Sequence, residues 1–205
     1  AMTLTQSLLL IAFLVFAGGA VSALLALRAG RWHENRWHWA LMLAGFVLQT
    51  AFLYWRGRDV AQCPMKSLPD ILVFISWSMV LLYFLVGSAY RLSLLGVFTG
   101  PMVAALLALS AFLPGAFAAY PARGKIDALV ELHVALALVA YAAFAMAAVT
   151  GVMYLLQERL LKSHRIGRLF FQLPPIQELA RAILRLVLLG LVLLSASLGL
   201  TFALE

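Results

Sequence analysis

The stretch LVELHVALALVAYAAFAMAAVTGVMYLLQE, residues 129–158, is long and apolar enough to cross a bilayer as one α-helix, because about 20 such residues span the hydrocarbon core. Away from its ends it contains one strongly polar side chain, His133. The helical period places His133 on a face of mostly small residues that also carries Tyr141 and Phe144. Such a face admits either a flat ligand or the close approach of a second helix.

A histidine inside a membrane is a candidate functional residue, because burying an ionisable group there is costly. Four roles are open to His133: metal ligand, axial haem ligand, proton carrier, or hydrogen-bond partner between helices. The last is the commonest role for a lone membrane histidine. A four-ligand zinc site is not favoured, because the other histidines fall in segments predicted to lie on the opposite side of the membrane.

Composition identifies an integral membrane protein. Of the 205 residues, 65% are hydrophobic and 11% are charged, whereas soluble domains are about 45–50% apolar. Repeated long apolar runs without strand-like alternation predict helices rather than a barrel. The net charge of +7 is typical of basic cytoplasmic loops, so we predict no nucleic-acid partner. The lone cysteine, Cys63, excludes an intrachain disulfide and a cysteine-only metal cluster.

We predict an all-α, polytopic transmembrane helical bundle that forms a single domain over residues 1–205. The loops assigned to the inner side hold nine Lys and Arg residues and those assigned to the outer side hold five, so both termini are predicted to lie outside. His33 and His38 are then expected to be solvated at the inner headgroup level. The six predicted spans lie near residues 4–27, 37–54, 69–90, 94–113, 128–157 and 179–203.

A basic segment follows the fifth span. Near residues 158–172, apolar side chains alternate with charges at helical spacing, which predicts a cytoplasmic amphipathic helix lying on the membrane surface. The rival interpretation is a helix that docks a protein partner. Its partner-binding residues would be Arg159, Lys162, Arg165 and Arg168.

Several stretches resemble the cytochrome c assembly membrane family, and together they cover most of residues 60–200. One is the entry ELHV at 131–134 with its exit GVMYL at 151–155, and another is LPPIQELARAILRLVLLGLVLLSASLGL at 173–200. The third contains an outer proline, an acid that opens a helix, two aromatic residues and a later Gly-x-Phe-x-x-Pro. Its matching residues are Pro64, Asp70, Phe74, Trp77, Gly96, Phe98 and Pro101.

The resemblance implies a non-enzymatic protein of the bacterial inner membrane that binds or passes haem near its outer face. His133 would be the axial ligand of the haem iron, and Asp70, Phe74, Trp77 and Tyr141 would shape the site if the third and fifth spans are neighbours. The partners implied are membrane lipid and proteins of haem delivery or cytochrome c maturation.

Two departures from the family pattern favour its shorter HemX-like and YpjD-like branch. The Trp-rich outer loop and the later helices with a second histidine are absent. The chain is therefore expected to be truncated at its C-terminus relative to the family, and His133 has no evident second axial ligand. The alternative function is a cofactor-free scaffold or accessory subunit, for instance of a cation-efflux system, that docks its partner through the basic segment.

Overall fold

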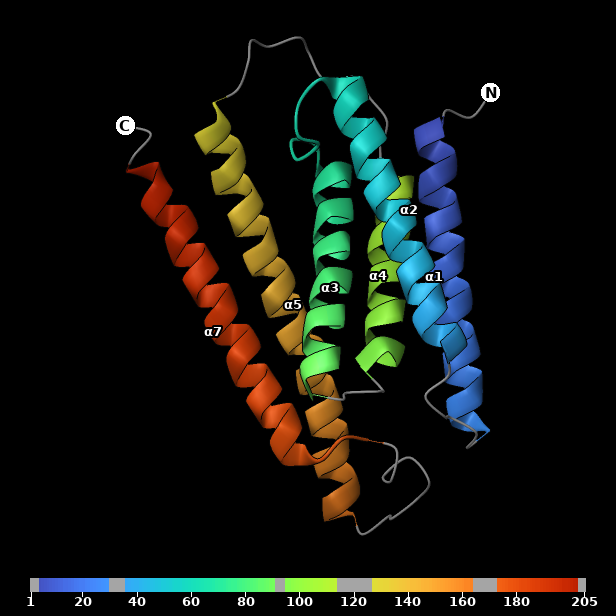
Figure 1. Ribbon diagram of the computed structural model, residues 1–205. Coiled ribbons are helices and arrows are strands. Elements are labelled where there is room, and N and C mark those ends of the chain that lie inside the picture. The colour runs from blue at the N-terminus through green and yellow to red at the C-terminus, as the bar shows by residue number, and fades with distance from the viewer. Residues whose placement is uncertain (1–3, 30–35, 91–94, 114–126, 164–172, 203–205) are drawn as a thin grey trace.

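The fold is a bundle of long α-helices (Figure 1). The computed structural model describes residues 4–29, 36–90, 95–113, 127–163 and 173–202. Six helices and no strand are found within these ranges, as the apolar runs predict. They are α1 (Leu4–Arg28), α2 (Arg36–Val60), α3 (Leu68–Tyr90), α4 (Leu95–Phe112), α5 (Ala128–Lys162) and α7 (Ile176–Thr201).

Successive helices run in opposite directions, so the start of α1 and the end of α7 lie at the same end of the bundle (Figure 1). We call this end the outer end, following the Lys and Arg distribution. Of the described helices, α1, α3, α4, α5 and α7 are long and apolar enough to cross a membrane. The exception is α2, which packs in the bundle against α1 and α3. The chain is thus a multi-pass helical membrane protein.

Two helices extend further than predicted. α2 continues to Val60, so Arg56 lies inside a helix and not in an outer loop. α5 continues through Lys162 and ends at Ser163, so a separate amphipathic helix does not begin at residue 158. The remainder of that segment, 164–172, lies outside the described residues.

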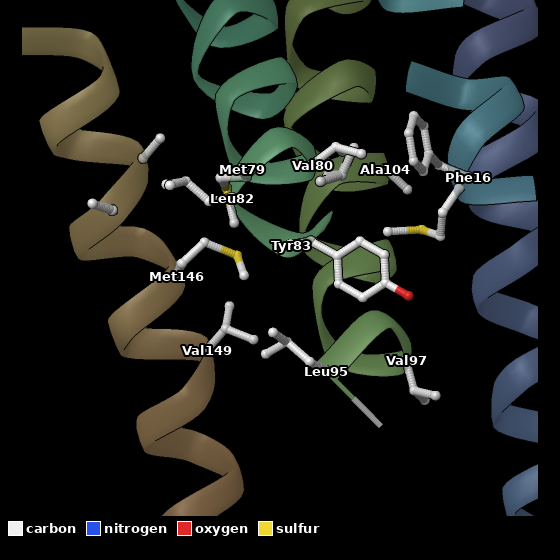
Figure 2. Packing of buried hydrophobic residues seen from close by; sticks show 14 of the residues in the cluster. Phe16, Met79, Val80, Leu82, Tyr83, Leu95, Val97, Ala104, Met146 and Val149 are labelled. Atoms are coloured by element: carbon white, nitrogen blue, oxygen red, sulfur yellow. The ribbon is translucent and has the colours of Figure 1, made fainter. Parts of the chain in front are cut away.

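The apolar core lies where α1, α3, α4 and α5 meet. Figure 2 shows Phe16 from α1, Met79 and Tyr83 from α3, and Met146 from α5 pointing into this region. α4 crosses it with Pro101 inside the helix. This packing fixes the position of α3 between α2 and α5, which decides what each face of α3 contacts.

Polar contacts join α2 to α3. Arg56 donates from Nε and Nη2 to the two carboxylate oxygens of Asp70, at 3.1 and 3.2 Å, and both side chains are buried. Nearer the middle of the helices, Gln49 donates to Ser76 Oγ at 2.7 Å. A buried charge needs a partner because the low-dielectric interior does not solvate it. The pairs therefore explain how a helix as polar as α2 is held in the bundle.

We expect Asp70→Ala to destabilise the bundle by about 3 kcal/mol, because it leaves the buried Arg56 guanidinium without its carboxylate. The free energy of unfolding in mixed detergent and SDS measures the effect. Asp59→Ala is the matched control, since Asp59 is an exposed carboxylate on α2, and it should change stability by less than about 0.5 kcal/mol. Equal stability of the two variants would contradict the structural role of the pair.

Candidate functional site

His133 lies near the outer end of α5, where α5 packs along α7. The helix begins at the N-cap Asp127, whose side chain accepts a hydrogen bond from the Leu129 amide. His133 is therefore in the second turn of the helix. α7 is the principal neighbour of this face of α5, and the two helices run side by side for most of their length (Figure 1).

Three polar contacts join His133 to Ser197 on α7, and in one of them the Ser197 hydroxyl oxygen lies 3.0 Å from His133 Nδ1. His133 Nδ1 lies 2.7 Å from the Ser197 carbonyl oxygen, and the Ser197 hydroxyl donates to the His133 carbonyl oxygen at 2.8 Å. A carbonyl oxygen only accepts, so the 2.7 Å contact is a hydrogen bond when the proton of the neutral imidazole is on Nδ1. The lone pair is then on Nε2, which is the form in which a histidine binds a metal while its other nitrogen donates to a carbonyl.

Below His133, the small-residue face of α5 is covered by α7. α7 comes close to α5 at Gly190, which is buried. A Cβ atom there would lie 2.6 Å from the ring of Phe144. Close helix packing is therefore the use of this face that the structure shows around Phe144, whereas Tyr141 on the same face is half exposed.

The residues predicted to surround His133 are not assembled around it. Trp77 donates its indole N–H to Thr50 of α2 at 2.9 Å, and it stacks on Phe46 of α2 with ring centroids 5.5 Å apart. Phe74 contacts Trp77 at 5.7 Å between centroids. α3 and α5 are neighbours, but these rings belong to the side of α3 that faces α2.

The other predicted site residues also have partners elsewhere. Asp70 is buried in its ion pair with Arg56, and it accepts a further hydrogen bond from Ser67 at 2.6 Å. Tyr141 is half exposed on α5. Among the described residues, no three His, Cys, Asp or Glu side chains form a group able to hold a metal ion. His133 is therefore the only predicted residue whose described geometry suits axial ligation.

Apolar side chains surround the outer ends of α5 and α7. Leu129 and Leu132 of α5 are 38% and 47% exposed, and Phe202 after α7 is 81% exposed. Leu129 lies one turn before His133 on the same face. These side chains provide exposed apolar surface at the level of the imidazole. The small-residue face of α5 provides no such surface there.

The outer loop between α2 and α3 contacts the start of α5. The Cys63 amide donates to the Glu131 carboxylate at 3.1 Å. Burial raises the pKa of the Cys63 thiol, and the negative charge of Glu131 raises it further. The thiol is thus less reactive than an ordinary cysteine, which agrees with a packing role for this residue.

Two features were missed from the sequence. His38, expected in solvent, is 9% exposed and packs against Gly96 and Tyr83, so that a Cβ at Gly96 would lie 2.6 Å from His38 Nε2. Arg56 was assigned to a loop and proves to be the partner of Asp70. The spacing of Gln49 and Arg56, seven residues apart on one helix face, is a signal that would have placed Arg56 inside α2.

Part of the predicted partner-binding set can be located. Arg159 and Lys162 are exposed at the inner end of α5, and Lys162 pairs with Glu158 at 2.7 Å. Arg165 and Arg168 lie outside the described residues. The end of α5 thus presents two of the four predicted cations at the inner side of the bundle.

The Cys63–Glu131 contact predicts a pH dependence. Because the thiol pKa is raised, the reactive thiolate is depleted at a given pH, and alkylation by iodoacetamide should be slower than for an unburied thiol. Glu131→Gln retains a hydrogen-bond acceptor but removes the charge, so the pH–rate profile should shift to lower pH. Glu178→Gln, at the inner end of α7, should leave the profile unchanged. Superimposable profiles for wild type and Glu131→Gln would contradict the contact.

The chain is similar to known proteins of one family. The family described as "Cytochrome C assembly protein" matches residues 65–204, which is more than half of the chain. Protein HemX of Brevibacillus brevis is 31% identical over 167 residues, which are 80% of this chain and 61% of that protein. Protein HemX of Bacillus subtilis (strain 168) is 24% identical over 168 residues, which are 80% of this chain and 60% of that protein.

These relatives are longer than the matched region. The chain spans about three fifths of the length of each HemX protein that it matches. No solved structure matches the chain. The family match covers α3, α4, α5 and α7, including both His133 and Ser197. The chain therefore belongs to the cytochrome c assembly family.

Proposed function

We propose that this protein binds haem near the outer face of the membrane, with His133 as an axial ligand, and hands it on without chemistry of its own. The single observation that carries the proposal is the hydrogen bond between His133 Nδ1 and the Ser197 carbonyl oxygen. It orients the ring and favours the tautomer whose Nε2 binds iron. Membership of a haem-related family supports the choice of haem over another metal.

The residues around His133 fit a haem group in part. The imidazole is suitable in tautomer and is incompletely buried, whereas the aromatic residues Trp77 and Phe74 contact α2 and do not form a wall beside it. The porphyrin, when bound, supplies the iron and the flat apolar face. This chain's contribution is a fixed imidazole and the exposed apolar side chains at the outer ends of α5 and α7. An open site of this kind suits a group that is passed on.

His133 also bonds to α7, so its removal has two effects that must be separated. His133→Asn places an amide N–H near the position of Nδ1, which preserves the donor to Ser197, but it has no atom at Nε2. We expect this variant to lose the Soret absorbance of haem-loaded protein while retaining the thermal stability of the wild type. His133→Ala should lose both absorbance and stability.

The control is His164→Ala, which removes a histidine predicted to lie on the cytoplasmic side and should keep its haem. Unchanged haem content in His133→Asn would exclude His133 as the ligand. In that case the imidazole would serve only as a hydrogen-bond partner between α5 and α7, as the commonest role of a lone membrane histidine predicts.

A second function rests on a different observation. α5 is 35 residues long, about 52 Å at 1.5 Å per residue, and thus exceeds the roughly 30 Å hydrocarbon core. Its exposed cations Arg159 and Lys162 therefore lie at or beyond the inner membrane boundary. This position suits a scaffold or accessory subunit that docks a cytoplasmic or membrane partner.

Charge reversal tests this second function. Arg165→Glu combined with Arg168→Glu should disrupt co-purification of a cytoplasmic partner, because the introduced negative charges would repel an acidic partner. Haem content should not change, since the two functions use opposite ends of the molecule. Arg28→Glu, which reverses a charge at the inner end of α1, is the control. Retention of the partner by the double variant would exclude the basic segment as its docking site.

A further inference from the structure

An apolar groove of about 350 Å³ opens on the surface of the bundle between α4 and α5. It is lined by Phe98, Pro101, Met102 and Ala105 of α4 and by Val149 and Val152 of α5. Met102 and Val152 at its rim are 40% and 50% exposed. All six side chains are apolar, so the groove offers water no hydrogen-bond partner among its lining side chains.

The groove exists because α4 and α5 contact each other only sparsely. α4 packs mainly on α1 and α3, whereas α5 packs mainly on α7 and α3. The two helices therefore diverge on one side of α3, and no described side chain fills the space between them. Since both helices are candidate membrane spans, the open side of the groove faces the lipid.

The groove lies within one leaflet. α4 begins at its inner end with Leu95, and the groove is lined along α4 from Phe98 to Ala105, a length of about 10 Å. This is shorter than half of a hydrocarbon core of roughly 30 Å. The groove can therefore hold part of an extended hydrocarbon chain of the inner leaflet.

A positive charge lies at the inner end of the groove. Arg159 follows Val152 by seven residues, which puts it on the same face of α5 and about 10 Å closer to the inner side. Arg159 is exposed, and helical side chains lean towards the N-terminus of their helix, which here is the direction of the groove. The described residues provide no acidic partner for its guanidinium, whereas the neighbouring Lys162 is paired with Glu158.

We propose that this groove is a binding site for an anionic phospholipid of the cytoplasmic leaflet. One acyl chain lies along Phe98, Ala105 and Val152, and the phosphate group is bound by Arg159. The cytoplasmic leaflet carries anionic lipids, and one basic residue near the surface contributes about 1 kcal/mol to their attraction. The site is independent of His133, which lies at the other end of α5 and faces α7.

Native mass spectrometry of the full chain tests the proposal with phosphatidylglycerol and phosphatidylcholine of identical acyl chains. Wild type should retain phosphatidylglycerol preferentially. Arg159→Gln should retain both lipids with the preference reduced about fivefold, as expected for the loss of one basic residue. Ala105→Trp should retain neither, because the indole fills the groove. Val152→Trp gives a second test from the α5 side.

Val192→Trp is the matched control, since Val192 is 63% exposed on α7 and does not line the groove. It should retain lipid like the wild type. Lipid retention by Ala105→Trp and Val152→Trp equal to that of Val192→Trp would overturn the acyl-chain site. An unchanged headgroup preference in Arg159→Gln would overturn the assignment of the phosphate to Arg159. Circular dichroism melting of each variant shows whether the fold is retained.

Discussion

A polar group carried into a bilayer finds no water there, and the arrangement of these helices follows from that constraint. Arg56 meets both oxygens of Asp70, Gln49 meets Ser76, and His133 meets Ser197, each time on another helix. Leaving one member of such a pair alone costs more than the pair contributes when intact. The polar pairs therefore select which helix faces meet, and the apolar contacts fill the remaining interface.

The sequence was sufficient to predict the helical bundle, because long apolar runs and breaks at Gly and Pro are local signals. It did not reveal which faces meet. Asp70 was predicted to open a helix and, from the family resemblance, to shape the haem site, since nothing local identifies Arg56, fourteen residues away, as its partner. The face of His133 permitted a ligand or a helix, and α7 packs closely on it at Phe144 through Gly190. α3 lies between α2 and α5, and Trp77 and Phe74 are on the side of α3 that faces α2.

The contact with α7 also limits what His133 can do. A histidine bonded through both its ring and its backbone carbonyl to one residue has little rotational freedom. Such a ring suits ligation through a fixed nitrogen better than proton transfer by rotation, which requires both nitrogens in turn. Phe144 and Gly190 pack closely on the same side of α5, three turns further along the helix.

The same pairing of α5 with α7 explains the opening on the other side of α5. A helix has a limited circumference, and α5 uses much of it against α7 and α3. α4 packs against α1 and α3 and makes few contacts with α5. The space between α4 and α5 therefore stays unfilled at Pro101 and Val152. In water this apolar opening would be unfavourable, but in a bilayer a hydrocarbon chain fills it without the cost of exposing apolar surface. The contact of His133 with α7 and the groove between α4 and α5 thus have one cause, which is that α5 packs closely against α7 and only sparsely against α4.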